Sequence, residues 1–283
     1  MTHYGLTIGA RDGLQVIDCK SCGYAHLETL PTEAELVEFY KSDFWQTYKA
    51  GELEKYESQL DWLNTRAQDW LELLANHVSG YDLLDYGAGY GHFAMQAMRD
   101  EWRVEAIEPS ETAAAYALAH RVRVIPIHEA GKYNAISALW LIEHLYNPVS
   151  FLQWVRAHLL EGGCLLLAAP NDFTEIQARA NEIAKRKFWW IDKSHLNYFT
   201  PSSMANLLGL SGFKIVERQT MYQMEKEILD GQDYTDNPQM GKICHAAVMA
   251  EDMRVPRSVR TRWYADQALS GMGREIILIA KAV

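Results

Sequence analysis

The chain has 283 residues, of which 48% are hydrophobic, so it can bury the core of one large domain or of one domain with an appendage. Its 37 acidic and 27 basic residues give a net charge of -10, which excludes the broad positive field that non-specific nucleic-acid binding needs. No window reaches the roughly 18 uninterrupted apolar residues that a membrane span requires, and the first residues show no signal region. We therefore expect a cytoplasmic protein that binds neither nucleic acid nor membrane.

The predicted elements begin with an N-terminal leader over residues 1–50. The segment QVIDCKSCGYAHL, residues 15–27, predicts two short strands around a Cys-x-x-Cys turn, which is the shape of half a zinc ribbon. A tetrahedral zinc site needs four ligands, and only Cys19, Cys22 and His26 lie nearby in the sequence. We therefore expect a turn held by hydrogen bonds and no bound metal. Thr32 and Glu35 then predict the capping box of a short helix.

The main domain is predicted over 51–283, and it opens with one long amphipathic helix. Apolar residues recur there at spacings of three and four, namely Leu53, Tyr56, Leu60, Leu63, Ala67, Trp70 and Leu74. This stripe either packs against the domain behind it or forms the seam of a homodimer.

From residue 81 the chain shows an α/β pattern, in which short apolar strands alternate with helices. Such a pattern is typical of a mostly parallel sheet covered on both faces. We predict seven strands, at 81–86, 103–108, 121–125, 133–140, 163–169, 213–220 and 274–281. A helix follows the fourth strand, with Asn147 as its cap and Gly162-Gly163 at its end. The segment LWLIEHLYNP, residues 139–148, then lies at the carboxyl edge of the sheet, where ligands bind.

The segment LLDYGAGYGHFA, residues 83–94, predicts a ligand-binding turn after the first of these strands. Its GYGHFA part fits the dinucleotide fingerprint G-x-G-x-x-A. A carboxylate at Asp85 about 4 Å from a diphosphate would cost on the order of 4 kcal/mol at an effective dielectric of 20, whereas it would attract a cation. Glu108, after the next strand, offers two acceptor oxygens to two ribose hydroxyls. The turn therefore favours a cationic nucleoside such as S-adenosylmethionine over a dinucleotide.

Four segments in order resemble the class I S-adenosylmethionine-dependent methyltransferases, over about residues 81–283. LLDYGAGYG and VEAIEPS look like the first two family motifs, and LLEGGCLLLAAPN is similar to the strand that follows a Gly-Gly turn in these enzymes. YNAISALWLIEHLYNP resembles the post-motif region of the ubiquinone-methyltransferase-like branch. The resemblance implies a Rossmann-like sheet whose last strand is antiparallel and lies between the fifth and sixth. It also implies methyl transfer with S-adenosylmethionine as cofactor.

The resemblance also implies the residues that bind the cofactor. The stretch VIPIHEAGKYN lacks the acid that the family usually offers to adenine, so Ile127 and His128 are expected at that ring. The predicted cofactor-binding residues are Asp85, Gly87, Ala88, Gly89, Gly91, Glu108, Pro109, His128, Trp140 and Leu141.

Three residues are candidates for the chemistry of the methyl acceptor: Glu143, His144 and His195. A neutral histidine suits removal of the acceptor's proton because it titrates near physiological pH. His144 lies in the post-motif loop, where a bond to the backbone is the alternative role, and Glu143 either orients a partner or caps the loop. His195 lies in a segment, about 171–200, that resembles the lid of bacterial methyltransferases acting on sugars, polysaccharides or secondary metabolites. The leader resembles the tail of the zinc ribbon that precedes some of these enzymes, without its upstream Cys-x-x-Cys.

We therefore expect methyl transfer to a small polar acceptor, a hydroxyl of a sugar, nucleotide sugar or glycan. Trp140, Trp189, Trp190 and Tyr198 would add aromatic surface to the mouth of the site. The run 185–187 (Lys-Arg-Lys) either meets a diphosphate or is a solvated helix end, and a helical insertion at about 221–272 forms a pocket wall or a dimer contact. Two other functions stay open: a dinucleotide-dependent oxidoreductase, and a non-catalytic module that keeps the cofactor fold.

Overall fold

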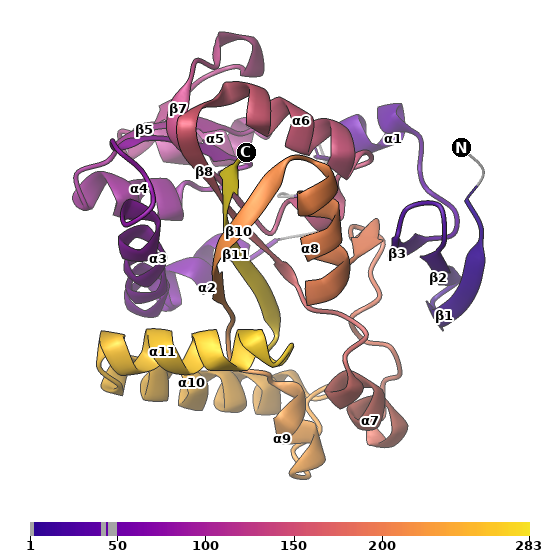
Figure 1. Ribbon diagram of the computed structural model, residues 1–283. Helices are drawn as coiled ribbons and strands as arrows, with labels where there is room; N and C mark the ends of the chain where they lie inside the picture. Colours follow the sequence, from indigo (N-terminus) through magenta and orange to yellow (C-terminus); the bar gives the residue numbers. More distant parts are fainter. Residues whose placement is uncertain (1–2, 41–43, 45–49) are drawn as a thin grey trace.

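A seven-stranded sheet forms the centre of the computed structural model, which describes residues 3–40, 44 and 50–283 (Figure 1). The strand order is β10-β11-β8-β7-β4-β5-β6, and β11 pairs antiparallel with both β10 and β8 while the remaining pairs are parallel. This confirms the predicted sheet, including the last strand between the fifth and sixth. The strands are β4 (Asp82–Tyr86), β5 (Arg103–Ile107), β6 (Arg123–Val124), β7 (Tyr133–Leu139), β8 (Leu159–Pro170), β10 (Phe213–Gln219) and β11 (Glu275–Ala282).

Each face of this sheet has its own apolar core. Successive residues of a strand point to opposite faces, so Leu83 and Leu84 of β4 belong to different clusters, as do Leu165 and Leu166 of β8. All four are fully buried, which explains why these strands read as continuous apolar runs. The helices packed around the sheet are α3 (Leu60–Ala75), α4 (His92–Arg99), α5 (Glu111–Ala119), α6 (Pro148–His158) and α8 (Pro201–Leu210).

The helix after the fourth strand ends earlier than predicted. Asn147 caps α6 through the Ser150 backbone N–H at 3.0 Å, but the helix stops at His158, and residues 159–163 already belong to β8. Leu159 pairs with Tyr133 of β7, so the chain joins the sheet before it reaches the Gly-Gly pair. The prediction that Gly162-Gly163 ends this helix is therefore wrong.

The long helix predicted over 53–74 is two helices, α2 (Glu52–Ser58) and α3, with a break at Gln59. The Ser58 hydroxyl donates to the Lys55 carbonyl at 2.7 Å, and the Gln59 N–H donates to the Tyr56 carbonyl at 3.0 Å. These local bonds replace the regular pattern of the α-helix at this point. The break turns Tyr56 onto the ring of His92, with 5.0 Å between the ring centroids.

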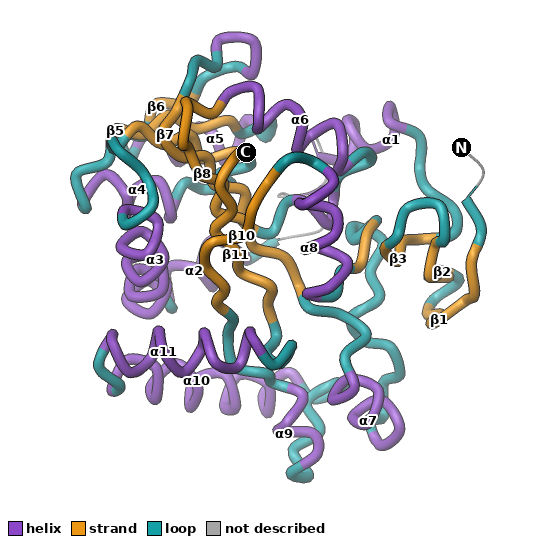
Figure 2. The backbone as a smooth tube through the Cα atoms, viewed as in Figure 1, coloured by secondary structure: helices purple, strands orange, loops and turns teal. Residues whose placement is uncertain are grey.

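The leader forms a second, smaller sheet beside the main one (Figure 2). β2 (Leu14–Cys19) and β3 (Tyr24–Leu27) match the predicted strands, and α1 (Glu33–Glu38) begins at the predicted capping box of Thr32. β1 (Gly5–Arg11) was not predicted: Leu6, Ile8 and Ala10 alternate along it, but most of its residues are exposed and two of the seven are glycines. The fourth strand is β9 (Asn197–Tyr198), which comes from the segment predicted as a lid. Residues 41–43 and 45–49 of the predicted leader lie outside the described residues.

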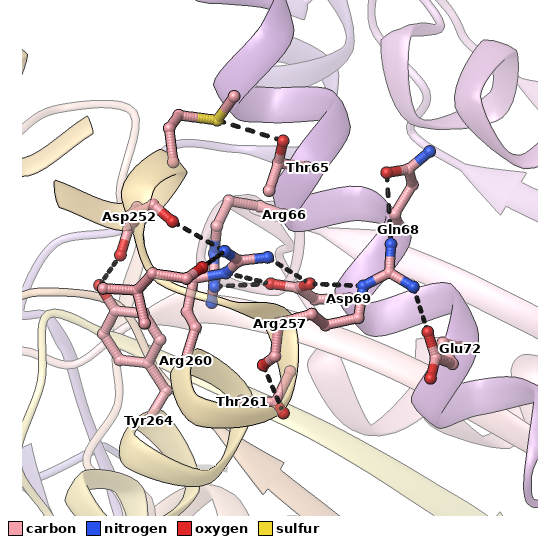
Figure 3. A network of polar contacts seen from close by, with 12 residues as sticks. Thr65, Arg66, Gln68, Asp69, Glu72, Asp252, Arg257, Arg260, Thr261 and Tyr264 are labelled. Carbon is pink, nitrogen blue, oxygen red and sulfur yellow. Dashed lines mark hydrogen bonds and ion pairs between the residues drawn. The ribbon is translucent and has the colours of Figure 1, made fainter. Parts of the chain in front are cut away.

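Helices α9 (Glu225–Leu229), α10 (Pro238–Arg254) and α11 (Arg257–Leu269) make up the insertion between the last two strands, and α7 (Glu175–Ile183) precedes β9. The insertion is attached to α3 by a buried polar network (Figure 3). The carboxylate of Asp69 accepts from Arg66 at 2.8 Å and from two nitrogens of Arg260 at 2.7 Å. Asp252 accepts from Trp62 at 2.8 Å and from Tyr264 at 2.7 Å. Within the described part of the chain, no helix has the length and apolar character to cross a bilayer.

Asp69→Asn tests whether this network holds the insertion. We expect the free energy of unfolding to fall by about 3 kcal/mol, because the substitution leaves two buried guanidinium groups without their anion. Urea unfolding measures the change. Glu251→Gln is the matched control, since its pair with Arg254 is solvent-exposed and is expected to contribute less than about 1 kcal/mol. Equal losses in the two variants would contradict the assignment.

Candidate active site

A cavity of about 870 Å³ opens where β4, β5 and β7 end. The loops after these strands form one wall, α2 and α3 form another, and α1 of the leader closes a third side. Most of the lining is apolar. Its aromatic members are Tyr40, Phe44, Tyr56, Trp62, Trp70, Tyr86, Tyr90, Phe93, Trp140 and Tyr146.

The glycine turn after β4 brings the backbone to the cavity. Gly87, Gly89 and Gly91 have φ values of 76°, 54° and 79°. A Cβ at Gly87 would lie 2.9 Å from Cδ1 of Leu141, and a Cβ at Gly91 would lie 3.0 Å from Cβ of Ala117. The left-handed backbone favours glycine at all three positions, and at Gly91 the nearby Ala117 also leaves little room for a side chain. Gly91 is the N-cap of α4 and lies behind the cavity, whereas Gly87 and Gly89 line it.

The carboxylate of Glu108 is fixed at the end of β5 by two backbone groups. Its Oε2 accepts from the Gly89 N–H at 2.7 Å, and its Oε1 accepts from the Ser110 N–H at 2.9 Å. Both oxygens are acceptors, which is the property that two ribose hydroxyls require. Pro109 lines the cavity next to it.

The turn after β6 contributes an apolar surface beside Glu108. Ile125, Pro126 and Ile127 line the cavity there. His128 does not: its side chain is 78% exposed, because the short 3-10 turn Ile127–Glu129 directs it to solvent. The structure thus brings Ile127 to the cavity wall and does not bring His128 there.

Asp85 lies at the floor of the cavity and is 2% exposed. Its Oδ1 accepts from the hydroxyl of Ser137 on β7 at 2.7 Å. Burial raises the pKa of Asp85 to about 7; the Ser137 hydroxyl lowers it in part, and the nearby charge of Glu108 raises it further. A positively charged ligand group beside this carboxylate would favour its ionised form.

Trp140 and Leu141, which were predicted to bind the cofactor, line the cavity directly after β7. Trp140 has a φ of 51°, which is unusual for a large side chain, and its indole N–H donates to Glu275 at 3.0 Å. Ala88 also lines the cavity. The structure therefore brings eight of the predicted cofactor-binding residues to one cavity: Asp85, Gly87, Ala88, Gly89, Glu108, Pro109, Trp140 and Leu141.

Of the three candidates for acceptor chemistry, His144 lines the cavity. Its Nδ1 lies 2.6 Å from the Ser194 carbonyl oxygen, so Nδ1 carries the proton and Nε2 is the nitrogen that can accept one. The His195 ring packs edge-on against it, with 5.0 Å between centroids. Glu143 is buried behind the loop, and its Oε1 lies 4.0 Å from Nε2 of His144. Burial raises the pKa of Glu143 well above its usual range.

Three of the four aromatic residues predicted at the mouth of the site lie elsewhere in the structure. These are Trp189, Trp190 and Tyr198, which pack with Val16 and Leu27 in the core between leader and lid. They are absent from the described lining of the cavity. The run 185–187 follows α7, and the Lys187 amine donates to the Asn181 and Glu182 carbonyls at the end of that helix. This run is also outside the described cavity lining, which supports the solvated helix end.

Sequence reasoning missed the contributions of the leader and of α3. Leu36, Val37 and Tyr40 come from α1 and its C-terminal end, and Arg66 comes from α3. The amphipathic pattern of both helices shows which residues are buried, but it does not show that they face a ligand cavity.

Comparison with known proteins identifies the family. A family model described as a methyltransferase domain matches residues 56–218. The chain belongs to this family. The predicted class, the class I S-adenosylmethionine-dependent methyltransferases, is thereby confirmed, and S-adenosylmethionine is the family's cofactor.

Two curated relatives are ubiquinone biosynthesis O-methyltransferases. The one from Rickettsia akari is 25% identical over 155 residues, which is 50% of this chain and 62% of that protein. The one from Rickettsia conorii is 25% identical over 138 residues, which is 45% of this chain and 48% of that protein. The chain therefore spans about half to three-fifths of the length of these relatives.

Solved methyltransferase structures share the fold of this domain. Magnesium protoporphyrin IX methyltransferase from Synechocystis, with bound S-adenosylhomocysteine, has a TM-score of 0.54 at 10% identity and covers 89% of this chain and 100% of its own. The 1,6-didemethyltoxoflavin-N1-methyltransferase from Burkholderia thailandensis has a TM-score of 0.52 at 15% identity and covers 98% of this chain and 99% of its own.

The raised pKa of Asp85 predicts that binding of S-adenosylhomocysteine depends on pH. Below pH 7 the carboxyl is protonated, so the ligand's ammonium must displace a proton; above pH 7 this cost disappears. We expect affinity about tenfold weaker at pH 6 than at pH 8, as measured by calorimetry. The Asp85→Asn variant should bind S-adenosylhomocysteine weakly, and its affinity should not change between pH 6 and pH 8. If the variant keeps the wild-type dependence, another group is responsible.

Proposed function

We propose that the protein transfers a methyl group from S-adenosylmethionine to a hydroxyl of a small acceptor with a flat, apolar body. The observation that supports this most directly is the single cavity that joins the glycine turn, Asp85 and Glu108 to the ring of His144. The mostly aromatic and aliphatic lining supports an apolar acceptor. The names of the curated relatives, as O-methyltransferases, agree with attack by an oxygen.

The residues around the glycine turn fit the cofactor. Asp85 would hold its ammonium, Glu108 its ribose hydroxyls, and the surface at 125–127 its adenine ring. The positive φ of Gly87 and Gly89 lets the backbone come close to the amino-acid part. When bound, S-adenosylmethionine supplies a sulfonium-bound methyl group open to in-line displacement.

His144 is proposed to accept the proton of the acceptor hydroxyl. The Ser194 carbonyl holds the proton on Nδ1 and orients Nε2 as the base. In the reaction the acceptor oxygen forms a bond to the methyl carbon as the sulfur–carbon bond breaks, and the hydroxyl proton passes to Nε2. His195, which packs against the ring of His144, is a positioning residue in this scheme.

An imidazole base favours a phenolic hydroxyl over an alcohol. Moving a proton from a phenol to an ordinary imidazole costs about 5 kcal/mol, whereas moving it from an alcohol as weakly acidic as water costs about 12 kcal/mol. The smaller cost lies within what a positioned base and an in-line geometry supply.

A sugar, nucleotide sugar or glycan, as predicted from the sequence, is the second candidate. Tyr40, Tyr56, Tyr90 and Tyr146 all line the cavity, and their rings offer faces for the C–H surface of a sugar.

Calorimetry of the purified protein with S-adenosylmethionine and with NADH tests the cofactor assignment. We expect binding of the first only, and Glu108→Ala should weaken it at least about tenfold because two charge-assisted hydrogen bonds to ribose are lost. The matched control is Glu161→Ala, an exposed acid outside the described cavity lining. Binding of NADH instead would favour the oxidoreductase, and unchanged affinity in Glu108→Ala would remove Glu108 from the site.

His144→Gln separates the base from the binding residues. With a panel of small phenols and nucleotide sugars, and S-adenosylhomocysteine release as readout, we expect methylation of a phenol and a kcat at least about 100-fold lower in the variant. Its affinity for S-adenosylhomocysteine should stay within about threefold. His158→Gln is the control, because its ring stacks on Trp154 outside the described wall of the cavity.

Three outcomes would contradict this proposal. Turnover of nucleotide sugars alone would support the second candidate. Full activity of His144→Gln would exclude His144 as the base. Cofactor binding without turnover of any acceptor in a metabolite extract would support a non-catalytic module.

A further inference from the structure

Four side chains with metal-binding atoms converge in the leader: His3, Cys19, Cys22 and His26. Each contributes one nitrogen or sulfur, and these four atoms lie within 4.8 Å of one another. The cluster lies in the small sheet and is independent of the cavity described above, because none of its members lines that cavity.

The β1–β2 hairpin brings the most distant member into place. Gly5 pairs with Cys19, and the Lys20 N–H donates to the Tyr4 carbonyl at 3.0 Å. A Cβ at Gly5 would lie 2.1 Å from the Asp18 carbonyl oxygen, so only glycine allows β1 to approach this closely. This close approach carries His3 over the Cys-x-x-Cys turn.

The distances around His3 match those of a tetrahedral zinc site. Zn–N bonds of about 2.05 Å and Zn–S bonds of about 2.3 Å place two nitrogens about 3.3 Å apart, and a nitrogen and a sulfur about 3.6 Å apart. The Nδ1 of His3 lies 3.1 Å from Nε2 of His26, 3.6 Å from the Cys19 sulfur and 3.3 Å from the Cys22 sulfur.

Neighbouring backbone groups orient these ligands. The Nδ1 of His26 lies 2.7 Å from the Leu27 carbonyl oxygen, so it carries the proton and leaves Nε2 to bind a metal. The backbone N–H groups of Ser21 and Cys22 donate to the Cys19 sulfur. Such bonds stabilise a thiolate ligand. Cys19 and His26 are 1% and 2% exposed, so half of the cluster is shielded from water.

We propose that His3, Cys19, Cys22 and His26 bind one structural zinc ion. Two thiolates and two imidazoles are a ligand set that suits zinc, and four protein ligands leave no open position for catalysis. The sequence alone indicated no metal, because it showed only three ligands close together. The fourth is His3, which is 16 residues from Cys19 in sequence and reaches the site through the strand β1.

The ion would also stabilise one wall of the cavity. His26 pairs with Asn197 of β9, and the Leu27 N–H donates to the Leu196 carbonyl at 2.9 Å. The Asn197 side chain in turn donates to the Leu145 carbonyl at 2.7 Å, next to His144. Zinc binding thus fixes the strand that supports the loop carrying the proposed base.

Metal analysis of the full chain tests this proposal. The protein is expressed with zinc and carries no N-terminal tag, since His3 lies beside the N-terminus and a histidine tag would itself bind zinc. We expect one zinc per chain, and replacement by Co²⁺ should give thiolate-to-cobalt charge-transfer bands. Cys22→Ser and His3→Gln should each weaken zinc binding by at least about tenfold, while the controls Cys244→Ser and His158→Gln keep the wild-type content.

Chelation gives a readout that does not depend on activity. EDTA should lower the melting temperature of the wild type and increase amide exchange at 196–198, and it should change neither in Cys22→Ser. A folded wild type that takes up neither zinc nor Co²⁺ would overturn the proposal. So would full zinc content in both ligand variants, or a disulfide between Cys19 and Cys22 in the freshly isolated protein.

Discussion

The buried carboxylate of Asp85 is the constraint around which the cavity is arranged. A carboxylate that is 2% exposed is costly to ionise, and here its hydrogen bond from Ser137 offsets only part of that cost. The bond exists because β4 and β7 are parallel neighbours with Asp85 opposite Ser137. The same pairing places the residues after β7, which include Leu141 and His144, beside the glycine turn after β4. One strand pair therefore brings together the proposed cation site and the proposed base.

The sequence predicts best what local patterns determine. The strands β4, β8 and β11 contain short apolar runs, and burial on both faces, as for Leu83 and Leu84, is the physical reason for that pattern. The glycine turn could be predicted because Gly87, Gly89 and Gly91 all adopt a positive φ, which glycine tolerates best. The role proposed for Glu108 follows from its place one strand later, at the same edge of the sheet.

Contacts between distant segments could not be predicted in the same way. The break at Gln59 involves a hydroxyl bond of Ser58, and the Tyr56 ring before it stacks on His92, which lies more than thirty residues away. The sequence at 189–190 does not show whether the two tryptophans face a ligand or a core. In the structure they pack against the leader sheet and belong to a core. His3 joins the Cys-x-x-Cys turn only through a hairpin whose first strand, β1, contains two glycines and is mostly exposed.

Two appended parts of the chain support opposite walls of the cavity. The insertion is attached to α3 by the carboxylates of Asp69 and Asp252, and α3 gives Trp62 and Trp70 to the cavity lining. The leader is attached to the main domain through β9, and α1 gives Leu36 and Val37 to the opposite side. In the methyltransferase reaction proposed here, these parts shape the acceptor space, while the sheet edge holds the cofactor.

A crystal structure with S-adenosylhomocysteine would show whether the glycine turn, Asp85 and Glu108 hold the cofactor. We expect the ligand's amino group within hydrogen-bond distance of Asp85 and both ribose hydroxyls on Glu108. A ligand bound elsewhere, or a ribose turned away from Glu108, would contradict this expectation.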